Sequence, residues 1–225
     1  MASGICRCLQ PQHNAQLVVV TGAPGSGKTA VLALMRHVFC EHVVFLPDAA
    51  RIVLGSRFPR VESAAGRRAV QRAIFRVQRE LERMAIDERT GAVVVCDRGT
   101  VDGSAYWPMD TSSYFAENET SHAAELARYR AVIDLRLPPA HLTYDPTNAA
   151  RIERMRRAAE VDASILSLWK EHPHRYVIDA EGDFLTKATQ AVAALNELVP
   201  SCCRPRRGVD VDRESTAGST TVAPP

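Results

Sequence analysis

The stretch AQLVVVTGAPGSGKTAVL, residues 15–32, decides how the rest of the chain is interpreted. Its first part is a short apolar run rich in valine, which is typical of a strand buried on both faces, as in a parallel sheet. From Thr29 onward the hydrophobic residues recur at helical spacing. Between the two, GAPGSGKT at residues 22–29 matches the pattern G-x-x-x-x-G-K-[ST] in the strand–loop–helix context that the pattern requires. We therefore expect a P-loop that holds the phosphates of a nucleotide.

The residue types of this loop suit phosphate binding. Glycines let the backbone curl so that successive N–H groups face one phosphate, and the following helix adds its dipole. Lys28 places a positive charge against the β- and γ-phosphate oxygens, and the Thr29 hydroxyl reaches Mg²⁺. The predicted nucleotide-binding residues are Gly22, Ala23, Pro24, Gly25, Ser26, Gly27, Lys28, Thr29 and Ala30. ATP is the expected nucleotide, with GTP as the alternative, because no Asn-Lys-x-Asp motif for guanine is present.

Strand-like and helix-like segments alternate along the chain. Four more short apolar runs predict strands at residues 42–47, 92–97, 131–139 and 175–180. Helices are expected at 29–40, 49–54, 62–88, 101–107, 123–130, 150–171 and 183–198, and a polar loop at 108–122. In the long helix, the apolar stripe is formed by Val70, Ile74, Val77, Leu81 and Met84. The alternation predicts an α/β fold, a three-layer αβα P-loop NTPase fold with a five-stranded, mostly parallel sheet.

Composition bounds the organisation and the partners. The 225 residues carry a formal net charge of +2, and 46% are hydrophobic, so nucleic acid and membrane are not expected as partners. No run of about 18 apolar residues occurs, and the N-terminal residues lack the apolar core of a signal peptide, so we expect a cytoplasmic protein. One nucleotide-binding domain is expected over 15–199, with disordered tails at 1–14 and 200–225. A nucleotide and a small-molecule substrate are the expected partners, and a homodimer is left open.

The six cysteines give no recognisable metal motif. Cys40 and Cys96 lie in apolar segments and are expected to be small core residues. A metal site built from both tails is conceivable, but its spacing matches no zinc pattern, so thiols are the preferred interpretation. The tail cysteines are Cys6, Cys8, Cys202 and Cys203.

Acidic residues at two strand ends indicate phosphoryl transfer. Asp97 follows the strand at 92–97 and is expected to hold Mg²⁺ through water, and Arg98 beside it is expected to reach acceptor or phosphate oxygens. Asp48 follows the strand at 42–47 and is the candidate base for a substrate hydroxyl. In the basic segment at 151–157, Arg151 and Arg154 are neighbours on one helix face and are candidates for a catalytic cover. The expected substrate contacts are Arg51, Asp102 and Tyr106.

Each of these residues also has a purely structural interpretation. Asp48 and Asp102 both stand where a helix begins, so either carboxylate is a candidate helix cap. Arg98 is a candidate for a surface salt bridge, and Tyr106 for the core. The basic segment is a candidate solvated helix, with Glu153 and Glu160 as ion-pair partners. The sequence alone leaves these alternatives open.

Four stretches together resemble a known family. They are VVVTGAPGSGKTAVL, FLPDAARIVL, VVVCDRGTVDGSAYW and NAARIERMRRAAEVDASILSLWKEHP, which fall within residues 15–199. The resemblance is to the AAA-type P-loop domain shared by the ribosylnicotinamide-kinase part of NadR and the TRPL translocation defect protein. It implies a nucleoside- or nucleotide-kinase-like fold that binds ATP or GTP. The chain departs from the family in having Asp48 where glutamate is usual, a side chain shorter by one methylene.

These features lead to one leading hypothesis and two rivals. The first is an ATP-dependent kinase that acts on a small hydroxyl-bearing metabolite such as a nucleoside. The second is a regulatory switch that hydrolyses ATP or GTP without a small-molecule acceptor, and the third is a binding module without catalysis. The acceptor itself is not specified by any motif.

Overall fold

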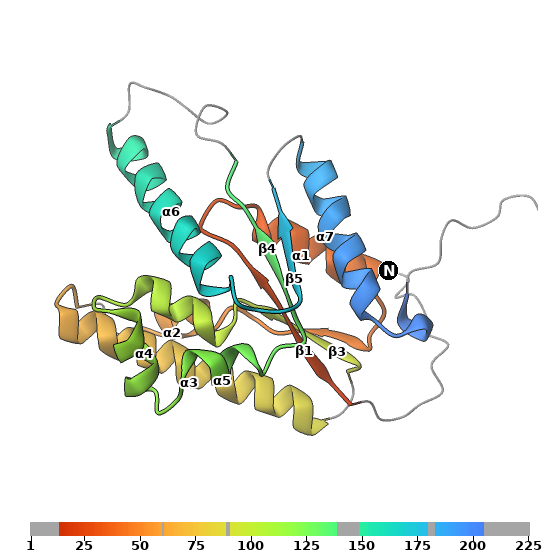
Figure 1. The fold of residues 1–225 in the computed structure, drawn as a ribbon, viewed down its shortest axis with the longest axis horizontal. Coiled ribbons are helices and arrows are strands. Elements are labelled where there is room, and N and C mark those ends of the chain that lie inside the picture. The colour runs from red at the N-terminus through yellow and green to blue at the C-terminus, as the bar shows by residue number, and fades with distance from the viewer. Residues whose placement is uncertain (1–13, 60, 89–90, 139–148, 180–182, 205–225) are drawn as a thin grey trace, which may run out of the picture.

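The computed structural model describes residues 14–59, 61–88, 91–138, 149–179 and 183–204, without the side chains of residues 149–154. Within these ranges the chain forms one five-stranded sheet in which all pairs are parallel. The strands are β1 (Gln16–Thr21), β2 (Val43–Phe45), β3 (Val93–Asp97), β4 (Ala131–Leu135) and β5 (Arg175–Ile178), in the order β2-β3-β1-β4-β5 (Figure 1). The predicted α/β fold with a five-stranded parallel sheet is confirmed.

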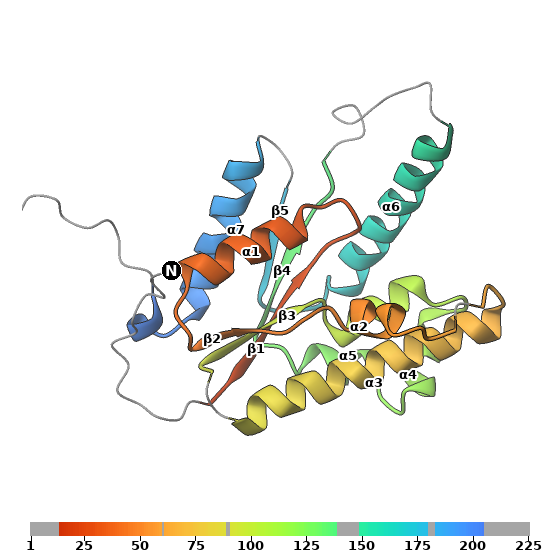
Figure 2. The same cartoon turned by 180° about the vertical axis from the view of Figure 1, so that it is seen from behind.

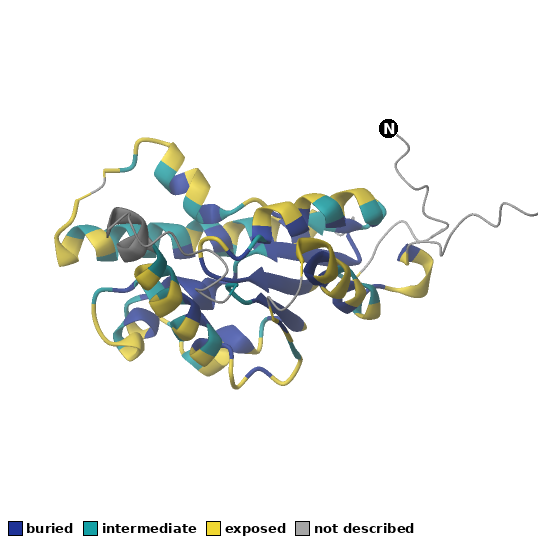
Figure 3. Ribbon diagram, turned by 90° about the horizontal axis from the view of Figure 1, so that it is seen from above, coloured by how far each residue is buried: buried dark blue, intermediate teal, exposed yellow. Residues whose placement is uncertain are grey.

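Helices cover both faces of this sheet (Figures 1 and 2). On one face lie α1 (Lys28–Val38) and α7 (Phe184–Leu198). The other elements are α2 (Ala49–Gly55), α3 (Ala64–Glu88), the 3-10 helix η1 (Thr100–Tyr106), α4 (Thr111–Glu117), α5 (His122–Leu126) and α6 (Ala149–Leu168). Alternate residues of β1 divide between the two cores: Val18 and Val20 pack with α1 and α7, and Val19 packs with α3, η1 and α6. The buried strands therefore form the middle of three layers (Figure 3).

One predicted loop is helical. Residues 111–117 form α4, within the stretch that was predicted to be a polar loop. Asp110 caps this helix, because its Oδ1 accepts a hydrogen bond from the Ser113 N–H at 3.0 Å. Tyr114 and Phe115 are buried on its inner side. The polar composition of the stretch led to the prediction of a loop, whereas the structure has a capped helix with two buried aromatic residues.

The buried face of α3 also differs from the predicted apolar stripe. Met84, which the stripe included, is 54% exposed, whereas Glu82 is fully buried. Phe75, Gln78 and Ala85 complete the buried side of this helix. The apolar periodicity missed this face because two of its four members are polar. Those polar groups are held in a buried hydrogen-bond network.

That network neutralises two buried carboxylates. Arg128 forms ion pairs with Glu82 and with Glu125, and both acidic side chains are fully buried. The Tyr129 hydroxyl donates to Glu82 Oε1 at 2.8 Å, and the Thr100 hydroxyl donates to Glu125 Oε2 at 2.7 Å. Thr100 begins η1, so the network anchors the start of the segment that follows β3. Buried charges of this kind are tolerated only when they are paired.

The chain also continues as ordered structure past residue 199. Ser201–Cys203 form a 3-10 helix, η3, within the segment that was predicted to be a disordered tail. Cys203 is only 2% exposed, because it packs into the core beneath α1 and α7. Among the described residues, none of the helices has the length and hydrophobicity needed to cross a membrane.

Replacing the shared cation of the network is expected to destabilise the fold. Arg128→Met leaves Glu82 with only neutral hydrogen-bond partners, and breaking a buried pair in this way costs about 3–5 kcal/mol. Urea denaturation of the purified protein measures this loss. Arg130→Met, a change at an exposed arginine two residues away, is expected to stay within about 0.5 kcal/mol of the original chain. Equal stability of the two variants would contradict the role of the network.

Candidate active site

The loop between β1 and α1 has the backbone of a phosphate cradle. Gly22, Gly25 and Gly27 have φ angles of 143°, 94° and 87°, which side-chain-bearing residues rarely adopt. A Cβ atom on Gly22 would lie 2.4 Å from the Leu135 carbonyl oxygen at the end of β4. The Ala30 and Val31 N–H groups both donate hydrogen bonds to the Gly27 carbonyl, each at 3.1 Å. These bonds begin α1 immediately after the loop. The predicted loop residues thus form one continuous turn at the N-terminus of a helix.

Lys28 and Asp97 meet beside this loop. Parallel pairing places Asp97 opposite Val20, one residue before the end of β1. The Lys28 ammonium forms an ion pair with Asp97 Oδ1. Thr29 follows in the first turn of α1 and is exposed. The fold therefore brings a cation that suits phosphate oxygens against a carboxylate of the kind that Mg²⁺ prefers.

A lysine that the sequence analysis missed supports the loop from below. The buried Lys187 on α7 donates to the Ser26 carbonyl at 2.8 Å and also to the Arg136 carbonyl. Burial is the main cause that lowers the pKa of Lys187, and nearby carboxylates oppose it. The sequence pattern that could have indicated a buried Lys187 is its spacing in α7, because Lys187 shares the buried face of this helix with Ala191 and Leu195.

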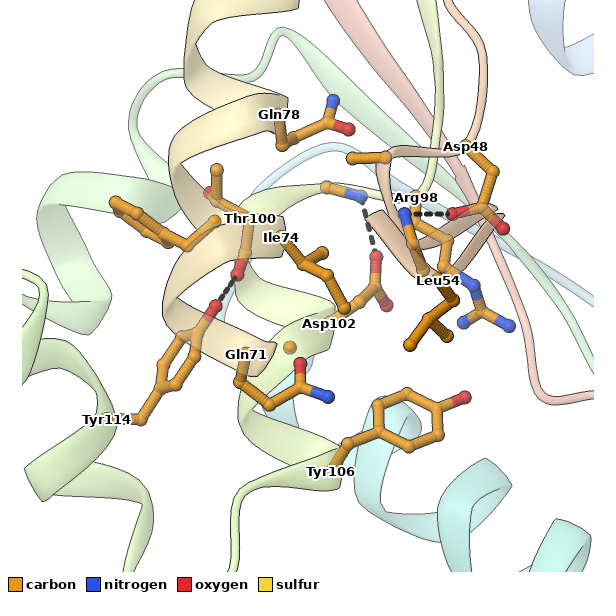
Figure 4. Close-up of a pocket in the computed structure, with 15 residues that line it drawn as sticks. Asp48, Leu54, Gln71, Ile74, Gln78, Arg98, Thr100, Asp102, Tyr106 and Tyr114 are labelled. Atoms are coloured by element: carbon orange, nitrogen blue, oxygen red, sulfur yellow. Dashed lines mark hydrogen bonds between the residues drawn. The ribbon is translucent and has the colours of Figure 1, made fainter. Parts of the chain in front are cut away.

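A cavity of 210 Å³ opens beside the ends of β2 and β3 (Figure 4). It is lined by residues before and within α2, by residues of α3, by residues between Arg98 and Tyr106, and by Tyr114 of α4. Four predicted site residues lie on its wall: Asp48, Arg98, Asp102 and Tyr106. The remaining wall is largely formed by side chains such as Leu54, Ile74 and Phe75. A mainly apolar pocket with a few convergent polar groups is typical of a small-molecule site.

Asp48 is at once a helix cap and a cavity residue. Its Oδ1 accepts the Ala50 N–H at 2.8 Å, so the capping interpretation is confirmed. The side chain is only partly buried and lines the cavity. Capping holds the carboxylate in one orientation at the cavity wall. Its role as a base stays a prediction.

Arg98 is held in an uncommon conformation with its guanidinium in the cavity. Its φ angle is 77°, and its backbone N–H donates to the Val20 carbonyl at 3.1 Å. The guanidinium carbon lies 5.7 Å from the centre of the Tyr106 ring. Its Nη1 is buried and has no hydrogen-bond partner in the described part of the chain. Burial alone would lower the pKa of Arg98, but the neighbouring tyrosine and carboxylates shift it upward, so the group stays charged.

Asp102 is buried and Tyr106 is half-buried. Asp102 accepts hydrogen bonds from the Thr21 hydroxyl, from the Gly99 N–H at 2.6 Å and from Trp169 Nε1 at 3.2 Å. Burial raises the pKa of Asp102, and Arg98 opposes this shift. Burial likewise raises the pKa of Tyr106. Asp102 therefore joins β1, η1 and the residue after α6 at the cavity wall, and the assignment of both residues to substrate contact stays a prediction.

The remaining predicted residues are Arg51, Arg151 and Arg154. Arg51 is an exposed residue of α2 and is not among the residues that line the cavity. Arg151 and Arg154 lie in the first two turns of α6, and their side chains fall outside the described residues. Farther along the same helix, Arg156 is exposed and forms an ion pair with Glu160 at 3.4 Å. The predicted cover therefore stays a prediction.

The sequence of the P-loop and cavity region matches a known family. The model of a family described as AAA domain matches residues 17–187, which include the P-loop and the cavity residues. The chain belongs to this AAA domain family. The family assignment made from the four sequence stretches is confirmed. Comparison with curated proteins found no match.

Solved structures with similar folds include NadR proteins and thymidylate kinases. A NadR protein in complex with NR has a TM-score of 0.58 and 17% identity, over 90% of this chain and 53% of that one. Thymidylate kinase from Candida albicans has a TM-score of 0.55 and 15% identity, over 82% of this chain and 91% of that one. The enzyme from Ehrlichia chaffeensis has a TM-score of 0.53 and 15% identity, over 81% and 98%. The AAA domain chain thus has a kinase-like fold and spans about half the length of the NadR chain.

Substituting the first glycine of the loop is expected to disrupt it. Gly22→Ala places a Cβ against the Leu135 carbonyl in a strained conformation, which costs about 1–3 kcal/mol and weakens nucleotide binding. Calorimetric titration with ATP and thermal unfolding measure both effects. Gly55→Ala is the matched control, because a Cβ there meets nothing within 4 Å and is expected to be neutral or slightly stabilising. Wild-type binding by Gly22→Ala would contradict the cradle geometry.

Proposed function

We propose that this AAA domain protein is a Mg²⁺-dependent kinase that transfers the γ-phosphoryl group of ATP to a hydroxyl of a small metabolite such as a nucleoside. The observation that carries the proposal is the cavity at the ends of β2 and β3, whose wall holds both Asp48 and Arg98. The buried Nη1 of Arg98 has no hydrogen-bond partner among the described residues. Kinases need this combination of an acceptor pocket, a base and a cation next to the phosphate cradle. The kinase-like fold agrees with the proposal.

The nucleotide side of the reaction belongs to the P-loop. Backbone N–H groups of the P-loop and of the start of α1 would face the phosphates, and Lys28 would neutralise the β- and γ-phosphate oxygens. Thr29 and Asp97 would hold Mg²⁺, which supplies charge neutralisation between the phosphates. The residue types present fit the ion, because the Asp97 carboxylate lies against Lys28 and the hydroxyl-bearing Thr29 is the next residue in the chain.

The acceptor side belongs to the cavity. Asp48 would accept the proton of the attacking hydroxyl, and its capped orientation fixes the oxygen that does so. Arg98 would donate to the acceptor or to the oxygens of the transferring phosphoryl group, where charge develops. At 210 Å³ the cavity is smaller than the roughly 300–1,000 Å³ of pockets for drug-sized ligands, so the proposed acceptor is small. The apolar wall would surround its non-reacting part and exclude water from the transfer.

A nucleotide-hydrolysing switch is the alternative function. The P-loop and Mg²⁺ residues serve hydrolysis as well as transfer. The cavity favours the kinase, because a switch needs no apolar acceptor pocket beside Asp48. A screen of the purified protein with ATP and GTP against nucleosides and other small alcohols separates the two. Transfer well above hydrolysis supports the kinase, and hydrolysis alone with every acceptor supports the switch.

Asp48→Asn is expected to remove most transfer without unfolding the chain. Asparagine caps helices as well as aspartate does, but it does not take up a proton, so the transfer rate should fall roughly 10²–10⁴-fold. Nucleotide binding, measured by calorimetry, is expected to persist. Asp110→Asn is the matched control, since Asp110 caps α4 away from the cavity. Equal transfer rates for the two variants would exclude Asp48 as the base.

Arg98→Met is expected to lower kcat more than it changes KM for ATP. Methionine keeps much of the length of the side chain but offers no donor, and loss of one such donor costs about 10²–10³ in kcat. Arg57→Met is the matched control, because Arg57 also has a positive φ of 64° but is exposed and outside the cavity wall. A purely structural Arg98 would instead lower the melting temperature and leave the kcat of the folded fraction unchanged.

A further inference from the structure

Three potential metal ligands lie close together at the end of the sheet that is opposite to the P-loop. Cys40 and His42 lie between the end of α1 and the start of β2, and Cys203 belongs to η3 near the end of the described chain. The P-loop follows the carboxyl end of β1, whereas His42 immediately precedes β2. Because all strands are parallel, the two places are at opposite ends of the sheet. The cluster therefore lies apart from the proposed kinase site.

The distances between these side chains approach those of a bound ion. The two sulfur atoms and a ring nitrogen of His42 all lie within 4.8 Å of one another. Cys203 Sγ is 3.9 Å from His42 Nδ1, and Cys202 Sγ is 3.7 Å from Cys203 Sγ. A tetrahedral zinc ion with its usual bond lengths separates two thiolates by about 3.8 Å and a thiolate from an imidazole by about 3.6 Å. Shifts of about 1 Å or less within side chains would complete that geometry.

The backbone around the cluster is fixed by the sheet. The His42 carbonyl accepts the Ala92 N–H at 2.7 Å and the Val93 N–H at 3.2 Å. Cys203 is buried in the same core as Val43 and Val199, while Cys40 and His42 are half-buried. An ion held here would have solvent access on one side and a rigid apolar support on the other. A site built on such fixed elements needs little rearrangement to bind.

The donor chemistry selects the ion. Thiolate and imidazole ligands in a tetrahedral arrangement are the set that structural zinc sites use. We propose that Cys40, His42 and Cys203 bind one zinc ion, with Cys202 as the nearest donor for the fourth position. The ion fastens η3 to the loop before β2 and so fixes the C-terminal end of α7 against the sheet. Its role is structural and independent of phosphoryl transfer.

The alternative is that these cysteines are small core residues, as was expected for Cys40 from its apolar segment. Metal analysis distinguishes the two, using the full chain, free of any histidine tag and purified under reducing conditions. Elemental analysis and native mass spectrometry are expected to show one zinc per chain. Replacement by Co²⁺ is expected to give the absorption bands of a tetrahedral thiolate site. Absence of stoichiometric zinc together with no such bands would overturn the proposal, as would a disulfide between two of these cysteines in the reduced preparation.

Variants locate the ion. His42→Gln and Cys203→Ser are each expected to weaken zinc binding by at least the roughly 10–100-fold that loss of a supporting residue costs. His37→Gln, at an exposed histidine on α1, and Cys96→Ala, in β3, are the matched controls and should keep the zinc. A chelator should lower the melting temperature of the original chain, and added zinc should restore it. Unchanged zinc affinity in both ligand variants would place the ion elsewhere and overturn the assignment.

Discussion

The parallel pairing of β1 with β3 is the constraint on which the site depends. It fixes Val20 opposite Asp97, so Lys28 of the P-loop meets the carboxylate that ends the neighbouring strand β3. The same register sends the backbone N–H of Arg98 to the Val20 carbonyl and turns its side chain into the cavity. A slip of one residue would move the Asp97 and Arg98 side chains to the opposite faces of the sheet. The register of β1 and β3 therefore determines which charged groups meet at the carboxyl end of these strands.

Hydrogen bonds and ion pairs of buried polar groups hold the segments that line the cavity in place. Asp102 accepts hydrogen bonds from a hydroxyl of β1, an N–H before η1 and the indole of Trp169 just after α6, so three segments of the chain meet at one carboxylate. The Glu82, Glu125 and Arg128 network fixes the start of the same 3-10 helix from the other side. A cavity wall held by paired charges is oriented more strictly than one held by apolar packing alone.

The local patterns in the sequence predicted the strands, the P-loop and the position of Asp97, because each of these is specified by a few adjacent residues. The helix at 111–117 was missed because its polar surface residues outnumber Tyr114 and Phe115. Lys187, Glu82 and Trp169 could not be assigned from the sequence, because their partners lie far away along the chain. The cysteine spacing matched no zinc pattern for the same reason, since 161 residues separate His42 from Cys203.

The contact between Lys187 and the P-loop has a consequence for how the protein is made. The Ser26 carbonyl is held by a side chain 161 residues later in the chain. During synthesis the loop sequence leaves the ribosome early, but its supporting helix α7 comes among the last of the described elements. At a translation rate of about 5–20 residues per second, roughly ten seconds or more separate the two. Throughout that interval the nascent chain carries a P-loop without this support, so nucleotide is expected to stabilise the domain only after α7 has docked.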